Sequence, residues 1–146
     1  MSAVPLHYVD LRTFSYATED EGRVESALRT FLPTDFEIER AETEGHYGDP
    51  IVVLSARVER ADEVRDVLDA VERLDEDELA TLQTQLDERV DEDTSLYVTF
   101  DKQAAYEGEP RLGDGITLRG KVEAYPAKKE SAVENVRELF ADLEAE

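Results

Sequence analysis

The chain has 146 residues and carries 37 acidic against 16 basic side chains, a formal net charge of −21. It has no cysteine, which excludes disulfides, thiol nucleophiles and thiolate-bound metal centres, and no apolar run reaches the roughly 18 residues that a membrane span needs. About a quarter of the residues are Leu, Ile, Val or Phe, so we expect one folded domain over residues 1–146. There is no secretory signal pattern, so we expect the protein to be cytoplasmic.

The first part of the chain predicts a strand followed by a helix. Residues 5–16 are rich in β-branched and aromatic side chains, with a break in alternation near Tyr8, as in a bulged strand. Thr18 and Glu21 have the spacing of a capping box, and apolar residues then recur at helical intervals until Pro33. We therefore expect a helix between Thr18 and Pro33.

A hairpin and an acidic helical region follow. Residues 36–40 alternate as a second strand, residues 45–50 have turn chemistry, and the apolar run 51–54 suits a central strand. Two helical stripes come next, over residues 64–71 and 79–90, and the second is expected to begin at Asp75 or Asp77.

The last third predicts two more strands and a final helix. Residues 96–100 alternate, residues 116–124 form a longer strand that Pro126 ends, and residues 133–143 carry a helical stripe. The order is β-α-β-β-α-α-β-β-α. This pattern predicts an α+β fold with a mostly antiparallel sheet of about five strands and helices on one face.

The acidic residues are spread along the whole chain without a long block, which indicates a surface adapted to concentrated salt, as in an extreme halophile. At molar salt the Debye length falls to about 3 Å, so the net charge does not exclude an anionic partner.

One segment departs from this acidity. Between residues 102 and 129 six bases face four acids, and this segment holds all four lysines of the chain. It is consistent either with an anion-binding site or with an incidental fluctuation of charge. The six bases are Lys102, Arg111, Arg119, Lys121, Lys128 and Lys129.

The strand over residues 116–124 places Arg119 and Lys121 on the side opposite its apolar residues. Neighbouring cations on an exposed sheet face suit phosphate contacts. The alternative is an ordinary wet face, on which both cations pair with acids of neighbouring strands.

His46 and Tyr47 stand between two glycines in the predicted hairpin turn. An imidazole and a phenol held at a hairpin tip can stack on unpaired bases. In the alternative, the glycines only permit the turn and Tyr47 folds back on the sheet.

Catalytic chemistry has little support. The two histidines, His7 and His46, fall in different elements, so neither a metal site nor a nucleophilic triad is indicated. Gly113 and Gly115 precede a strand instead of a helix, which predicts a plain turn and no phosphate cradle. We expect no catalytic residues, no metal and no cofactor, although a metal-dependent hydrolase that uses carboxylates remains an alternative.

Three stretches of the chain resemble an archaeal, haloarchaeal-type family of small predicted RNA-binding proteins. They are His7 to Phe14, Gly45 to Ile51, and Phe100 to Tyr106 with the strand that runs to Pro126. That family is described as exosome-associated, with a fold like the double-stranded-RNA-binding domain, and is similar to ribosomal protein five of the large subunit. The resemblance implies structured RNA, such as ribosomal RNA, as ligand, and exosome or ribosome-assembly proteins as partners.

Two hypotheses follow. The first is a non-catalytic RNA-binding module that recognises structured RNA by shape, in which the six bases contact the backbone and His46 and Tyr47 are stacking groups. We expect no DNA and no membrane as partner. The second is a protein-interaction subunit of an RNA-processing or ribosome-assembly complex that makes no RNA contact itself.

Overall fold

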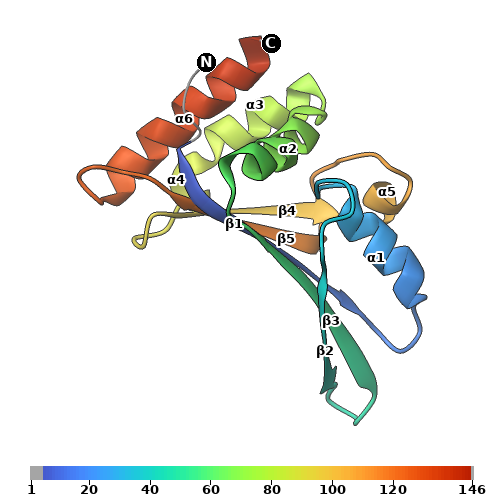
Figure 1. Cartoon of the computed structure of the whole chain (residues 1–146). Coiled ribbons are helices and arrows are strands. Elements are labelled where there is room, and N and C mark those ends of the chain that lie inside the picture. The colour runs from blue at the N-terminus through green and yellow to red at the C-terminus, as the bar shows by residue number, and fades with distance from the viewer. Residues whose placement is uncertain (1–4, 146) are drawn as a thin grey trace.

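A five-stranded antiparallel sheet in the order β2-β3-β1-β5-β4 forms the centre of the computed structural model, which describes residues 5–145 (Figure 1). The strands are β1 (Leu6–Ser15), β2 (Glu39–Glu44), β3 (Pro50–Val58), β4 (Ser95–Asp101) and β5 (Gly115–Val122). The helices are α1 (Glu21–Arg29), α2 (Ala61–Glu72), α3 (Glu76–Thr84), α4 (Leu86–Arg89), α5 (Lys102–Tyr106) and α6 (Lys129–Ala145). The predicted α+β fold with an antiparallel five-stranded sheet is confirmed.

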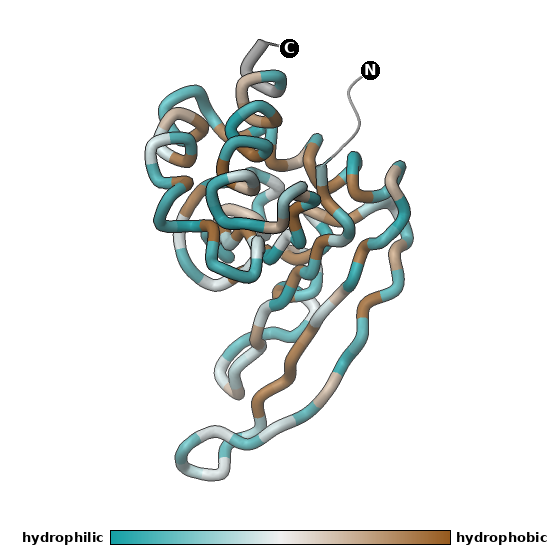
Figure 2. The backbone as a smooth tube through the Cα atoms, turned by 90° about the vertical axis from the view of Figure 1, so that its left-hand side faces the viewer, coloured by the Kyte–Doolittle hydropathy of each residue, from teal (hydrophilic) through white to brown (hydrophobic). Residues whose placement is uncertain are grey.

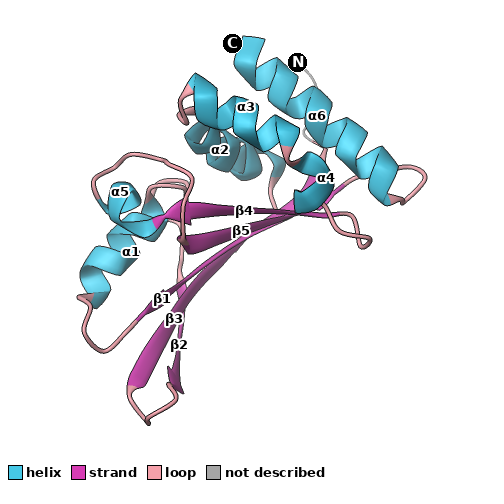
Figure 3. Ribbon diagram, turned by 180° about the vertical axis from the view of Figure 1, so that it is seen from behind, coloured by secondary structure: helices cyan, strands magenta, loops and turns pink. Residues whose placement is uncertain are grey.

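The helices form two groups over one face of the sheet. α1 and α5 lie at one end, and α2, α3, α4 and α6 lie at the other (Figure 3). Strand residues that point toward the helices are buried, as Val9 and Leu11 of β1 show. The rings of Phe31, just after α1, and Phe100, on β4, have centroids 4.4 Å apart, so the first helix group is fixed to the sheet by an aromatic contact.

The β2–β3 hairpin extends away from the helices, with the hydrophobic residues of β3 running along it (Figure 2). Every residue of β2 is exposed, because this strand is an edge of the sheet and no helix covers its outer part. No helix of residues 5–145 lies on the opposite face of the sheet (Figure 3), so the outward side chains of the central strands are open to a partner.

Several local predictions are confirmed. The register of β1 against β5 shifts between Leu6 and Tyr8, as the broken alternation predicts. Asp75 caps α3 by accepting a hydrogen bond from the Glu78 N–H. The stripe of the final helix is buried at Val133, Val136 and Phe140; the side chain of Leu143, also in the predicted stripe, lies outside the described residues.

The predicted helix between Thr18 and Pro33 is shorter than expected. Its cap is Asp20, whose carboxylate accepts from the Gly22 and Arg23 N–H groups, so the predicted capping box at Thr18 is wrong. The helix ends at Arg29 because the next three residues form tighter turns, in which the Phe31 N–H, for example, donates to Leu28 O at 3.1 Å.

Later boundaries differ as well. The second strand begins at Glu39, after Phe36 and Ile38 have packed against the core. The single stripe predicted over residues 79–90 is divided at Gln85 into α3 and α4. The short helix α5 was not predicted, because its five residues give no helical period; Asp101 caps it by accepting from the Ala104 N–H. Within the described chain, no helix is long and apolar enough to cross a membrane.

Candidate functional site

The helix-free side of the sheet, here called the open face, carries polar and aromatic side chains from four adjacent strands. They alternate with the buried residues of each strand because successive side chains point to opposite sides. The open face consists of Tyr8, Asp10, Arg12 and Phe14 of β1, Ser55 and Arg57 of β3, Thr117, Arg119 and Lys121 of β5, and Tyr97 and Thr99 of β4.

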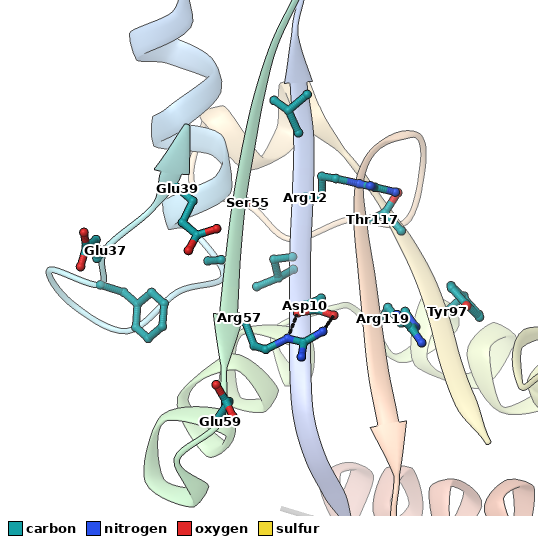
Figure 4. A pocket seen from close by; sticks show the side chains of 14 residues that line it. Asp10, Arg12, Glu37, Glu39, Ser55, Arg57, Glu59, Tyr97, Thr117 and Arg119 are labelled. Carbon is teal, nitrogen blue, oxygen red and sulfur yellow. Dashed lines mark hydrogen bonds and ion pairs between the residues drawn. The ribbon is translucent and has the colours of Figure 1, made fainter. Parts of the chain in front are cut away.

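A hollow of about 830 Å³ lies on this face (Figure 4). Its polar lining comes mainly from the middle of the sheet, and three glutamates stand at its rim. The lining includes Asp10, Arg12, Ser55, Arg57, Tyr97, Thr117 and Arg119, with Glu37, Glu39 and Glu59 at the rim.

Strand register places four of these side chains in one row across the sheet. Arg57 is opposite Asp10, Asp10 is opposite Arg119, and Arg119 is opposite Tyr97. Arg57 Nε and Nη2 donate to the two Asp10 carboxylate oxygens at 2.7 and 2.9 Å. The bidentate hydrogen bonds and the charge of Asp10 hold the pKa of Arg57 above its ordinary value.

Arg119 and Arg12 lie on the open face beside the Arg57–Asp10 pair. Asp10 is already occupied by Arg57, and neither Arg119 nor Arg12 forms an ion pair with any described residue. The Arg119 Nε is buried and has no hydrogen-bond partner within residues 5–145. Arg12 is exposed and lies over the Phe14 ring, 5.7 Å from its centroid. Two guanidinium groups without carboxylate partners, in so acidic a chain, are free to bind an anion.

Lys121 is also on the open face, one row further along the strands. Its ammonium donates to the backbone carbonyl of Asp93, which fixes the side chain but leaves its charge without a carboxylate in the described chain. The predicted outward direction of Arg119 and Lys121 is therefore confirmed. The alternative, that both pair with acids of neighbouring strands, is not what the structure shows.

The other four bases of the segment 102–129 lie elsewhere. Lys102 points toward the end of β1, where its ammonium donates to Phe14 O at 2.8 Å and to the Glu19 carboxylate at 2.9 and 3.0 Å. Arg111 pairs with Glu109 in the loop before β5. Lys128 and Lys129 stand where α6 begins. The structure thus does not gather the six bases on one surface.

His46 and Tyr47 lie at the tip of the β2–β3 hairpin, outside the hollow. The Tyr47 side chain is 88% exposed and meets the His46 ring edge-on, with centroids 4.8 Å apart. Tyr47 therefore does not fold back on the sheet. The turn is closed by the Gly45 N–H donating to Asp49 O at 2.7 Å, and Gly48 has a φ of +80° that favours glycine.

Sequence reasoning missed Arg12, Arg57 and Tyr97 as members of this site. Arg12 and Arg57 lie outside the basic segment, so a search for clustered charge in the sequence could not find them. Alternation along the first strand would have placed Arg12 outward if the count of alternate residues had started after the irregularity at Tyr8. Cross-strand register, which sequence does not show, brings Arg57 beside them.

Lys102 has a structural role that can be tested by mutation. Its side chain is only 18% exposed and joins α5 to the end of β1. We expect Lys102→Met to lower the free energy of unfolding by about 1–3 kcal/mol, because hydrogen bonds to a charged group are lost. Urea denaturation at pH 7 measures this, with Lys128→Met as the exposed control; equal effects of both changes would contradict it.

The same ion pair makes this stabilisation depend on pH. Partial burial alone raises the pKa of Glu19, but hydrogen bonds from Lys102 and from the Tyr16 N–H outweigh it and hold the pKa below its ordinary value of 4.5. The stabilisation is therefore present above pH 4.5 and is lost as pH falls through the lowered pKa of the folded protein. The difference between wild type and Lys102→Met should shrink in that range.

No group of three or more His, Asp or Glu side chains among the described residues is arranged to hold a metal ion. The site combines arginines, hydroxyls and aromatic rings on an open sheet with Asp10 at its centre and three glutamates at its rim. A face of this kind, backed by helices on the other side, defines a class of small α+β domains that bind nucleic acid through phosphate contacts and stacking.

Comparison with known proteins agrees with this class. Residues 8–122 match a family described as RNA binding, and the chain belongs to that family. It is 40% identical over 141 residues to an RNA-binding protein of Pyrococcus abyssi, covering 90% of this chain and 92% of the relative. The archaeal RNA-binding family implied by the resemblance is thus confirmed.

Two solved structures have the same fold. A protein of Methanothermobacter thermautotrophicus is 40% identical, with a TM-score of 0.77 and coverage of 92% of this chain and 98% of the other. A protein of Archaeoglobus fulgidus is 33% identical, with a TM-score of 0.83 and coverage of 92% and 99%.

Proposed function

We propose that this protein is a non-catalytic module that binds structured RNA with the open face of its sheet. The observation that carries the proposal is that Arg12 and Arg119 have no carboxylate partner in the described chain, although acids outnumber bases by more than two to one. Both line the hollow, together with Thr117 and Ser55, whose hydroxyls can bind phosphate or ribose oxygens.

Lys121 adds a third cation without a carboxylate partner in the described chain to the open face, while His46 and Tyr47 can reach a more distant part of the RNA from the hairpin tip. Lys102 is engaged in the ion pair with Glu19, and Arg111 in the pair with Glu109, so we place neither in the main contact surface. The resemblance noted above leads us to propose further that the protein acts in RNA processing, in association with the exosome.

The test is binding of the purified protein to an RNA hairpin and to a single strand of matched length, at about 0.2 M and 2 M KCl, with folding followed by circular dichroism. We expect saturable binding that prefers the hairpin. With two or three phosphates contacted, the slope of log Kd against log salt concentration should be about 2 to 3 in magnitude.

A folded protein that shows no saturable binding would contradict the proposal and favour an interaction subunit without RNA contact. The exposed Tyr47 at the end of the extended hairpin is the observation that supports this second candidate. Pull-down from a native extract with and without nuclease separates the two, because partners of an interaction subunit survive RNA removal.

A further inference from the structure

Arg57 is held differently from the two unpaired arginines beside it. Its guanidinium carbon lies 4.1 Å from the centroid of the Tyr8 ring, which is close enough for the guanidinium to lie on the ring face. The bidentate hydrogen bonds to Asp10 fix the group in its own plane. Two independent contacts therefore determine both the position and the orientation of this planar cation.

This arrangement makes Arg57 a poor phosphate ligand. Asp10 occupies two of its five N–H donors and neutralises its charge, whereas Arg12 and Arg119 next to it have no such partner in the described chain. A phosphate is therefore expected to bind the unpaired neighbours, Arg12 and Arg119, more strongly than the neutralised Arg57. The role of Arg57 must therefore depend on something other than its charge.

One side of the guanidinium plane is accessible. The Arg57 side chain is 50% exposed, although Tyr8 covers one side of it. Arg57 and Asp10 line the hollow (Figure 4), whereas Tyr8 is not among its lining residues. We infer that the side of the guanidinium away from Tyr8 is the one next to the hollow. A flat, fixed, partly exposed guanidinium is a surface on which a nucleobase can stack.

We propose that Arg57, supported by Tyr8 and oriented by Asp10, is a stacking platform for one unpaired RNA base. This inference rests on the proposed function and names the RNA feature that the site recognises, an unpaired nucleotide beside a paired stem. The phosphates next to that nucleotide are then held by Arg119, opposite Asp10 in the same row, and by Arg12 in the next. Stacking is sequence-tolerant, so we expect any base to be accepted.

The test uses three RNA hairpins that differ at one position, measured by fluorescence anisotropy at about 0.2 M KCl. The first is fully paired, the second has one bulged adenosine, and the third has an abasic residue at the bulge. The last two have the same phosphates and differ only in the base. We expect wild type to bind the adenosine bulge about tenfold more tightly than the abasic bulge, since stacking of one base has an effect of this order.

Arg57→Lys keeps the positive charge opposite Asp10 and removes the plane. It should abolish the preference for adenosine over the abasic bulge and leave the affinity for the paired hairpin within about twofold. Arg60→Lys is the matched control, because Arg60 is exposed before α2, pairs with Asp62 and lies outside the open face; it should keep the preference.

Asp10→Asn provides a second variant in which electrostatics and stacking predict different results for the preference between the adenosine and abasic bulges. Removing a negative charge from the open face would through charge alone strengthen binding of all three hairpins alike and leave that preference unchanged. A platform that loses its bidentate orientation should instead lose several-fold in preference for the adenosine bulge. Circular dichroism and urea denaturation establish that both variants are folded.

Each outcome has a distinct meaning. Equal wild-type affinity for the adenosine and abasic bulges, with clear binding to all three hairpins, overturns the platform and leaves the proposed function intact. The platform is also overturned, with the proposed function intact, if Arg57→Lys weakens binding of all three hairpins equally. No binding of wild type to any hairpin overturns the proposed function itself.

Discussion

Replacing Arg12 and Arg119 together by alanine is expected to weaken RNA binding about 100-fold at about 0.2 M KCl. Hydrogen bonds from a guanidinium to a charged group contribute about 1.5 kcal/mol each at the lower end of their range, and 1.4 kcal/mol corresponds to a factor of ten. The loss should be similar for unrelated stem sequences, because phosphate contacts carry no sequence information.

The salt dependence gives a second readout of the same variant. Each phosphate contact removed lowers the magnitude of the slope of log Kd against log salt by about 1, so the double variant should lose about 2. At about 2 M KCl wild type and variant should therefore differ much less. A variant with weaker binding but an unchanged slope would show that the two arginines do not contact phosphate.

Arg111→Ala with Arg137→Ala is the matched control. It removes the same charge from the α5–β5 loop and from α6, which lie outside the open face. We expect less than a threefold change in affinity. Equal weakening by both double variants would place the RNA elsewhere or spread it over the whole surface.

Phe100→Ala is expected to lower the free energy of unfolding by about 3–5 kcal/mol, the usual cost of truncating a fully buried phenylalanine. Its ring packs on Phe31 at 4.4 Å between centroids, so the change removes the contact that joins the region after α1 to β4. Because small domains are only about 5–15 kcal/mol stable, this loss should be clear in urea or thermal denaturation.

Phe14→Ala is the matched control on the opposite side of the same sheet. Phe14 is on the open face and only partly buried, so its truncation leaves no closed cavity. We expect a loss clearly smaller than that of Phe100→Ala. Equal losses would mean that the open face is covered in solution, which would also argue against it as an RNA surface.

In so acidic a chain, the ability of a surface to bind an anion depends more on which cations lack a carboxylate partner than on how many cations there are. Arg40 binds Glu21 and Glu42, and the first of these contacts holds the pKa of Glu21 below its ordinary value. Arginines of this kind have their charge satisfied within the protein. At molar salt only direct contacts remain effective, since the Debye length is about 3 Å. An unpaired guanidinium that contacts the ligand then contributes more to the binding free energy than an excess of positive charge further away.

The sequence by itself determined the fold class and most of the elements. Apolar residues recur with the period of a strand in residues 116–124 and with that of a helix in residues 133–143; the structure has β5 and α6 there, although β5 ends at Val122. Element ends were less well determined, because capping at Asp20 and the division at Gln85 depend on local hydrogen bonds that compete with nearby alternatives.

The sequence also indicated the outward direction of Arg119 and Lys121, since strand alternation is a local property. It left open whether Tyr47 is exposed or folds back on the sheet, and the structure shows it exposed. It could not show that Lys102 is held by Glu19, 83 residues earlier, or that Arg57 binds Asp10, 47 residues earlier. Which cations are neutralised and which are free is decided by strand register and by the packing of α5 against the end of β1. For that physical reason, the tertiary structure alone decided which cations of the open face have no carboxylate partner among the described residues.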